Sequence, residues 1–158
     1  MLSAINLSLN ERKIEAHYVS LNYAVWDDEA RVMTIANSGL PQPIHVRQGR
    51  VKTIDARGLP AGLFPKAEYE EVTLHPEPGD CFVFFTDGIT DASDERGRML
   101  GRSRLEEVVA ANAQGSPQQL VNAVFDAATH HAGGAEAFDD QTVVALKVGP
   151  CTKRKTTA

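Results

Sequence analysis

Two short acidic motifs, each beside an apolar segment, constrain the fold of this chain most. Residues 81–85 form an apolar run typical of a buried strand, and Asp87 follows it almost at once. Asp139 and Asp140 come just before a second such run, residues 142–146. Two carboxylates about 4 Å apart repel by about 4 kcal/mol at a dielectric typical of a protein surface. A divalent cation removes this cost, so the pattern predicts an oxygen-ligated metal site at the edge of a buried sheet.

Composition limits the class of protein. A chain of 158 residues is long enough for one domain with a real core, which we place at residues 1–149, followed by a polar tail at 150–158. The net charge of −5 argues against a nucleic-acid-binding protein. No apolar run approaches the roughly 20 residues that cross a bilayer, and no signal peptide is evident. Two cysteines, Cys81 and Cys151, form no disulfide framework, so we expect a cytoplasmic protein.

The first half of the chain predicts antiparallel strands. Alternating apolar residues at 19–25 and 31–36 flank an acidic turn at 27–29 and indicate a hairpin. Residues 44–46 and 51–54 flank Gln48-Gly49 and indicate a second hairpin. Glycine and proline shape a loop at 58–65. Further strands are expected at 69–74 and 81–86.

The second half predicts helices and one closing strand. Ser103 with Glu106, and Ser116 with Gln119, have the spacing of two capping boxes, each opening a helix. Gly133-Gly134 ends the second of these helices, and residues 141–148 form the last strand. Leu2, Ile5 and Leu9 indicate a short helix within residues 1–12. Strands, a helix pair and a returning strand predict an α+β fold with helices on one face of an antiparallel sheet.

The metal-site interpretation depends on both motifs together. Asp87 alone is more typical of a turn after a strand, and Gly88 allows the chain to turn sharply or a ligand to approach. Two adjacent acids before a buried strand are poorly explained by turn chemistry. Carboxylate ligands without cysteine or histidine pairs favour Mg²⁺ or Mn²⁺ over zinc.

Several stretches resemble the metal-dependent protein phosphatase (PPM) superfamily, in its bacterial SpoIIE-like branch. The matching stretches follow the family's order and lie at residues 35–39, 58–63, 78–80, 84–91, 100–105 and 139–142. The resemblance implies a β-sandwich flanked by helices with a two-metal centre of Mn²⁺ or Mg²⁺ at its edge. It also implies hydrolysis of phosphoserine or phosphothreonine in a protein by a metal-activated water. Asp87 and Asp139 would be catalytic metal ligands, with Gly88 shaping the loop and Asp140 supporting them.

The chain departs from the family pattern in two places. The family carries an acidic strand and an Asp-Gly motif upstream of the matched region, and no counterpart is present here, so the resemblance predicts an N-terminally truncated domain with an incomplete metal centre. Leu40 stands where the family has histidine. Without the missing upstream elements, apolar surface would be left bare, which predicts that the chain forms a homodimer or is poorly stable. An upstream sensory or receiver domain and an anti-anti-sigma factor as the phosphoprotein substrate are further implications of the family.

Other interpretations stay open. A non-catalytic interaction module could retain the sandwich without a metal centre. A dehalogenase-type phosphatase needs a second acid two residues after its nucleophile, where this chain has Ile89. Three other groups of residues could contact phosphate or metal. An ordinary surface is the better interpretation of His130-His131 and of Asp91, Asp94 and Glu95, and an exposed hairpin is at least as good an interpretation of Arg47, Arg50 and Arg57.

Overall fold

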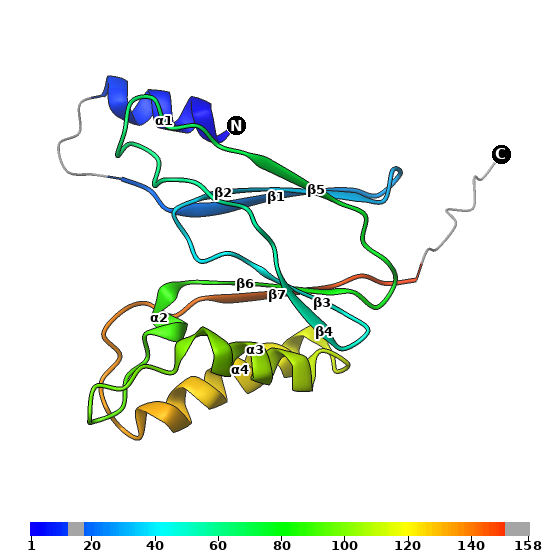
Figure 1. Ribbon diagram of the computed structural model, residues 1–158, viewed down its shortest axis with the longest axis vertical. Helices are drawn as coiled ribbons and strands as arrows, with labels where there is room; N and C mark the ends of the chain where they lie inside the picture. The colour runs from blue at the N-terminus through cyan, green and yellow to red at the C-terminus, as the bar shows by residue number, and fades with distance from the viewer. Residues whose placement is uncertain (13–17, 151–158) are drawn as a thin grey trace.

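A computed structural model describes residues 1–12 and 18–150, and within them two antiparallel sheets face one another (Figure 1). The first sheet has the order β1-β2-β5, formed by β1 (Leu21–Asp27), β2 (Val32–Ser38) and β5 (Glu71–Leu74). The second has the order β4-β3-β6-β7, formed by β3 (Ile44–Arg47), β4 (Arg50–Thr53), β6 (Cys81–Phe85) and β7 (Val143–Lys147). The predicted α+β sandwich flanked by helices is confirmed.

Helices lie on the two outer sides of this sandwich (Figure 1). The long helices α3 (Gly101–Asn112) and α4 (Pro117–Ala132) cover the outer face of the second sheet, and a single turn, α2 (Asp87–Thr90), follows β6. The expected N-terminal helix is α1 (Leu2–Glu11), which lies beyond the first sheet. Two cores result, one between the sheets and one between the second sheet and the helix pair.

Local turn chemistry explains both hairpins. β1 and β2 pair from Leu21 opposite Ser38 to Asp27 opposite Val32. The Asp27 carboxylate accepts hydrogen bonds from the amides of Glu29 and Ala30, which closes the acidic turn. Between β3 and β4, Gln48 and Gly49 both have positive φ, as a two-residue hairpin turn requires.

One of the two capping boxes is confirmed and the other is wrong. Ser116 accepts a hydrogen bond from the Gln119 amide, while the Gln119 side chain accepts one from the Ser116 amide. Ser103, in contrast, lies inside the first turn of α3, which begins at Gly101 with no side-chain cap. Its expected partner Glu106 accepts instead from Arg102, 2.7 Å away. Leu100, just before α3, is buried, and its amide donates a hydrogen bond to the Ala92 carbonyl. These contacts fix the earlier start of the helix.

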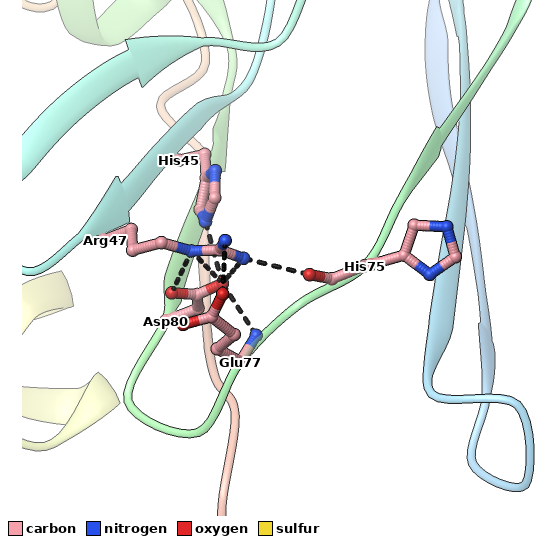
Figure 2. A network of polar contacts seen from close by, with 5 residues as sticks. All are labelled: His45, Arg47, His75, Glu77 and Asp80. Atoms are coloured by element: carbon pink, nitrogen blue, oxygen red, sulfur yellow. Dashed lines mark hydrogen bonds and ion pairs between the residues drawn. The ribbon is translucent and has the colours of Figure 1, made fainter.

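A buried carboxylate fixes the beginning of β6 (Figure 2). Asp80 is only 2% exposed and receives a bidentate interaction from Arg47 on β3, at 2.6 and 3.0 Å. The same arginine reaches Glu77 and the carbonyl of His75, and His45 Nε2 lies 3.0 Å from the carboxylate. Burial raises the pKa of Asp80, but the hydrogen bonds from Arg47 and the Glu77 amide outweigh it, so this pKa lies below its usual value.

Some expectations fall on residues outside the described part of the chain. These are Cys151 and all of the polar tail except Pro150. Cys81 is described, and it is a buried free thiol in β6 whose pKa is raised by burial. Among residues 1–12 and 18–150, no helix is long and apolar enough to cross a membrane.

Candidate metal centre

The two acidic motifs meet where β6 and β7 end side by side. The Thr86 amide donates to the Thr142 carbonyl at 3.1 Å, which extends the strand pairing past β6. The Thr86 hydroxyl donates to the Asp140 carbonyl at 2.9 Å and accepts from the Thr142 amide at 2.9 Å. Asp87 begins α2 directly after this junction. A single threonine therefore joins the loop that carries Asp139 to the strand end that carries Asp87.

Gly88 allows the closest approach between the two motifs. A Cβ atom at this position would lie 2.5 Å from the Asp140 carbonyl oxygen and 3.2 Å from that of Asp139. No real Cβ atom tolerates the shorter contact. The sequence suggested that this glycine admits a ligand or a turn; the structure shows that it admits the backbone of the second motif. Gly88 itself is buried within the one-turn helix α2, an element that the sequence pattern does not predict.

The carboxylates at this junction face solvent. Asp87, Asp139 and Asp140 are all exposed, and the Asp139 side chain accepts a hydrogen bond from the Asp140 amide at 2.7 Å. Within residues 1–12 and 18–150, no three histidine, cysteine or acidic side chains are grouped closely enough to hold a metal ion. The donors at the junction suit Mg²⁺ or Mn²⁺ by type, but they are too few for the octahedral shell of either ion. Ligation by Asp87 and Asp139 therefore stays a prediction.

A cavity borders the same junction. It has a volume of about 380 Å³ and is lined by Thr86, Thr142 and Leu40 together with apolar residues of β1, β6 and β7. The buried side chain of Asn37 holds the neighbouring loop, because its amide donates to the Leu40 carbonyl and accepts from the Leu40 amide. Leu40, the departure from the family pattern, thus presents an apolar wall near the acidic motifs.

The structure gives four of the remaining candidates partners within the chain. Arg47 is held by the buried Asp80, whereas Arg57 forms an exposed pair with Asp55, so the two arginines have separate partners. Asp94 closes its own turn by accepting from the amides of residues 96 and 98. His131 contacts the Arg98 carbonyl at the end of α4.

Sequence reasoning missed the role of Thr86. The available signal is a hydroxyl residue, Thr86, between an apolar strand and an aspartate. A second threonine, Thr142, stands at the start of the partner strand. It becomes interpretable only once the two strands are known to be neighbours, as they are here. Ile89, where a dehalogenase-type enzyme needs its second acid, is fully buried.

Comparison with known proteins identifies the family to which this chain belongs. The model of the family described as SpoIIE, stage II sporulation protein E, matches residues 1–149. This chain belongs to the SpoIIE family of PPM-type phosphatase domains. It is 24% identical over 149 residues to the phosphoserine phosphatase RsbU of Bacillus subtilis, covering 93% of this chain and 44% of RsbU. It is 26% identical over 133 residues to protein IcfG of Synechocystis sp., covering 83% of this chain and 21% of IcfG.

A solved structure supports the same fold. The phosphatase domain of SpoIIE from Bacillus subtilis, from a crystal presoaked with manganese, superimposes with a TM-score of 0.69 at 17% identity. The match covers 94% of this chain and 64% of that domain. The chain therefore spans less than half the length of the two curated relatives and about two thirds of the solved domain.

Proposed function

We propose that this chain carries part of a phosphoserine and phosphothreonine protein phosphatase that works through Mn²⁺ or Mg²⁺. The observation that supports it best is the enforced contact between the two acidic motifs at Thr86 and Gly88. The relatives named phosphatases agree with this choice. A phosphorylated bacterial regulatory protein, such as an anti-anti-sigma factor, is the proposed substrate class, and a cytoplasmic location is proposed with it.

In this proposal Asp87 and Asp139 supply the metal-binding carboxylates. When bound, the cations lower the pKa of a water molecule and neutralise charge on the phosphoryl group. The protein's own part is to hold two anionic side chains at one strand end, where their repulsion creates a high affinity for a hard cation. Asp140 supports them by accepting from Thr86 through its carbonyl and donating its amide to Asp139.

The alternative is an interaction module that keeps the fold without a complete metal centre. One observation favours it: the described residues contain no group of three metal-ligating side chains. The two functions differ in whether the acidic junction binds a divalent cation at all, and this can be measured without any assay of activity.

Titration of Mn²⁺ into this chain, followed by calorimetry and by the electron paramagnetic resonance signal of free Mn²⁺, tests the proposal. We expect saturable binding that Asp87→Asn and Asp139→Asn each weaken by about tenfold or more, since each removes one charged ligand. Asp126→Asn is the matched control, because this exposed acid lies on α4 and has no proposed role. Hydrolysis of a generic phosphate ester, dependent on Mn²⁺ and on Asp87, would support the enzyme. Absence of Mn²⁺ binding by the unmodified chain would favour the interaction module.

A further inference from the structure

Thr86 stands at the N-cap of α2 but does not cap this helix. Its backbone is extended, with φ −91° and ψ 159°, as is typical of a helix start, yet its side chain makes no cap hydrogen bond. A threonine at this position normally accepts a bond from an amide two or three residues further on. The Thr86 hydroxyl instead donates to the Asp140 carbonyl and accepts from the Thr142 amide, both at 2.9 Å. The side chain that could have stabilised α2 therefore holds the second acidic motif.

The two hydroxyl bonds fix the backbone on both sides of a single residue. Asp140 and Thr142 flank Gln141, just before β7 begins at Val143. The Thr86 amide already pairs with the Thr142 carbonyl, and the hydroxyl prolongs this pairing to Asp140. Because threonine is branched at Cβ, few rotamers are open to its side chain. The hydroxyl therefore holds the loop before β7 in one position relative to the end of β6.

The hydroxyl acts on one acidic side chain and not on the other. The Asp140 amide donates to Oδ1 of Asp139 at 2.7 Å, so a shift of Asp140 also shifts the Asp139 carboxylate. Asp87 is held differently, because it follows Thr86 directly and its carbonyl accepts from the Asp91 amide within α2. Neither of these constraints on Asp87 uses the hydroxyl. Removing the hydroxyl should therefore release Asp139 and leave Asp87 in place.

We propose that Thr86 is a positioning residue, which sets the cation affinity of the junction by orienting Asp139 without binding the cation itself. This inference rests on the proposed function, because it takes Asp139 to be a metal ligand. It predicts an asymmetry between the two acidic side chains. Loss of the hydroxyl should remove the contribution of Asp139 to cation binding and leave that of Asp87. A residue with a general stabilising role would not distinguish between them.

Amide hydrogen exchange followed by NMR in the absence of metal tests the positioning step. Thr86→Val keeps the shape of the side chain and removes the hydroxyl, and it costs α2 no cap bond. We expect exchange of the Thr142 amide to become about fivefold faster or more, since that amide loses its acceptor. Thr86→Ser retains the hydroxyl and should exchange near the original rate. Thr34→Val is the matched control, because this threonine has the same partial exposure and lies within β2, away from the junction.

Titration of Mn²⁺ into the same variants tests the asymmetry. Thr86→Val should weaken binding by about fivefold, Thr86→Ser should restore most of the affinity, and Thr34→Val should have no effect. Double variants then separate the two carboxylates. In the Thr86→Val background, Asp139→Asn should cost only about twofold in affinity, whereas Asp87→Asn should still cost about tenfold, because only Asp139 depends on the hydroxyl.

The results distinguish failure of the positioning role from failure of the proposed function. Absence of Mn²⁺ binding by the original chain would overturn both. Saturable Mn²⁺ binding together with unchanged Thr142 exchange in Thr86→Val would overturn the positioning role alone. The same conclusion would follow if Thr86→Ser restored no affinity, or if Asp87→Asn and Asp139→Asn cost the same in the Thr86→Val background.

Discussion

Replacing Gly88 with alanine tests whether backbone contact holds the two acidic motifs together. In most one-turn helices this change is favourable, since alanine exceeds glycine in helix propensity by up to about 1 kcal/mol. Here the new Cβ would stand 2.5 Å from the Asp140 carbonyl oxygen. That oxygen must retreat by about 0.5 Å or more, and it is the same atom that accepts from the Thr86 hydroxyl at 2.9 Å.

The structure therefore predicts that Gly88→Ala lowers the free energy of unfolding, whereas helix propensity alone predicts that it raises it. Overpacking of this kind costs about 1–3 kcal/mol, which outweighs the propensity gain. For a domain of this size, the net loss of about 1 kcal/mol lowers the melting temperature by about 2–4 °C. If the carboxylates bind a cation, Mn²⁺ affinity should fall as well, because the strand end carrying Asp87 and the loop carrying Asp139 move apart.

Thermal unfolding followed by circular dichroism, with Mn²⁺ titration alongside, measures both effects. Gly149→Ala is the matched control: a Cβ there meets no atom within 4 Å and the residue has no positive φ. We expect this control to be neutral or slightly stabilising. A Gly88→Ala variant that melts at or above the temperature of the original chain would refute the close approach of the two motifs.

Two further substitutions test interactions away from the junction. Asp80→Asn should lower the free energy of unfolding by about 2–3 kcal/mol in urea denaturation, since it removes the buried charged partner of Arg47. The remaining pair with the exposed Glu77, and the partial exposure of the arginine, keep the loss below that of a fully buried pair. Because the folded pKa of Asp80 is depressed, its contribution is complete above about pH 4 and is lost as pH falls through the folded pKa. The variant should therefore lose less stability than the original chain between pH 4 and pH 2, and an equal loss would contradict this. Ser116→Ala should cost about 1 kcal/mol by removing the cap of α4, whereas Ser103→Ala, at the position where no cap forms, should cost only a few tenths.

Local patterns in the sequence predicted most of the strands and helices. Alternation specified the β1–β2 hairpin, and the Gln48-Gly49 turn specified β3–β4, because both depend on neighbouring residues. The capping box at Ser116 was equally local. The one at Ser103 failed because the packing of Leu100 and a bond from its amide to Ala92, distant in sequence, set where α3 begins.

Long-range contacts could not be predicted in the same way. No residue near Arg47 in the sequence indicates that its partner is Asp80, 33 residues away. The sequence therefore left Arg47 open as a phosphate-binding residue. The meeting of the two acidic motifs was predicted only as a consequence of strand ends sharing one edge. The contacts that bring the motifs together, made by the Thr86 hydroxyl and by the space at Gly88, could be identified only from the structure.

The way the junction is built separates its stability from its proposed chemistry. Thr86 joins the motifs through its hydroxyl, and Gly88 does so by leaving room for the Asp140 carbonyl, while the carboxylates of Asp87 and Asp139 face solvent and contribute little to this contact. Removing their charge should therefore leave folding intact, or even relieve repulsion, and affect only what the junction binds. An enzyme and a module without a metal centre can share this scaffold, so only cation binding distinguishes them. If Asp87→Asn and Asp139→Asn unfolded the chain, the carboxylates would be structural, and this separation would be wrong.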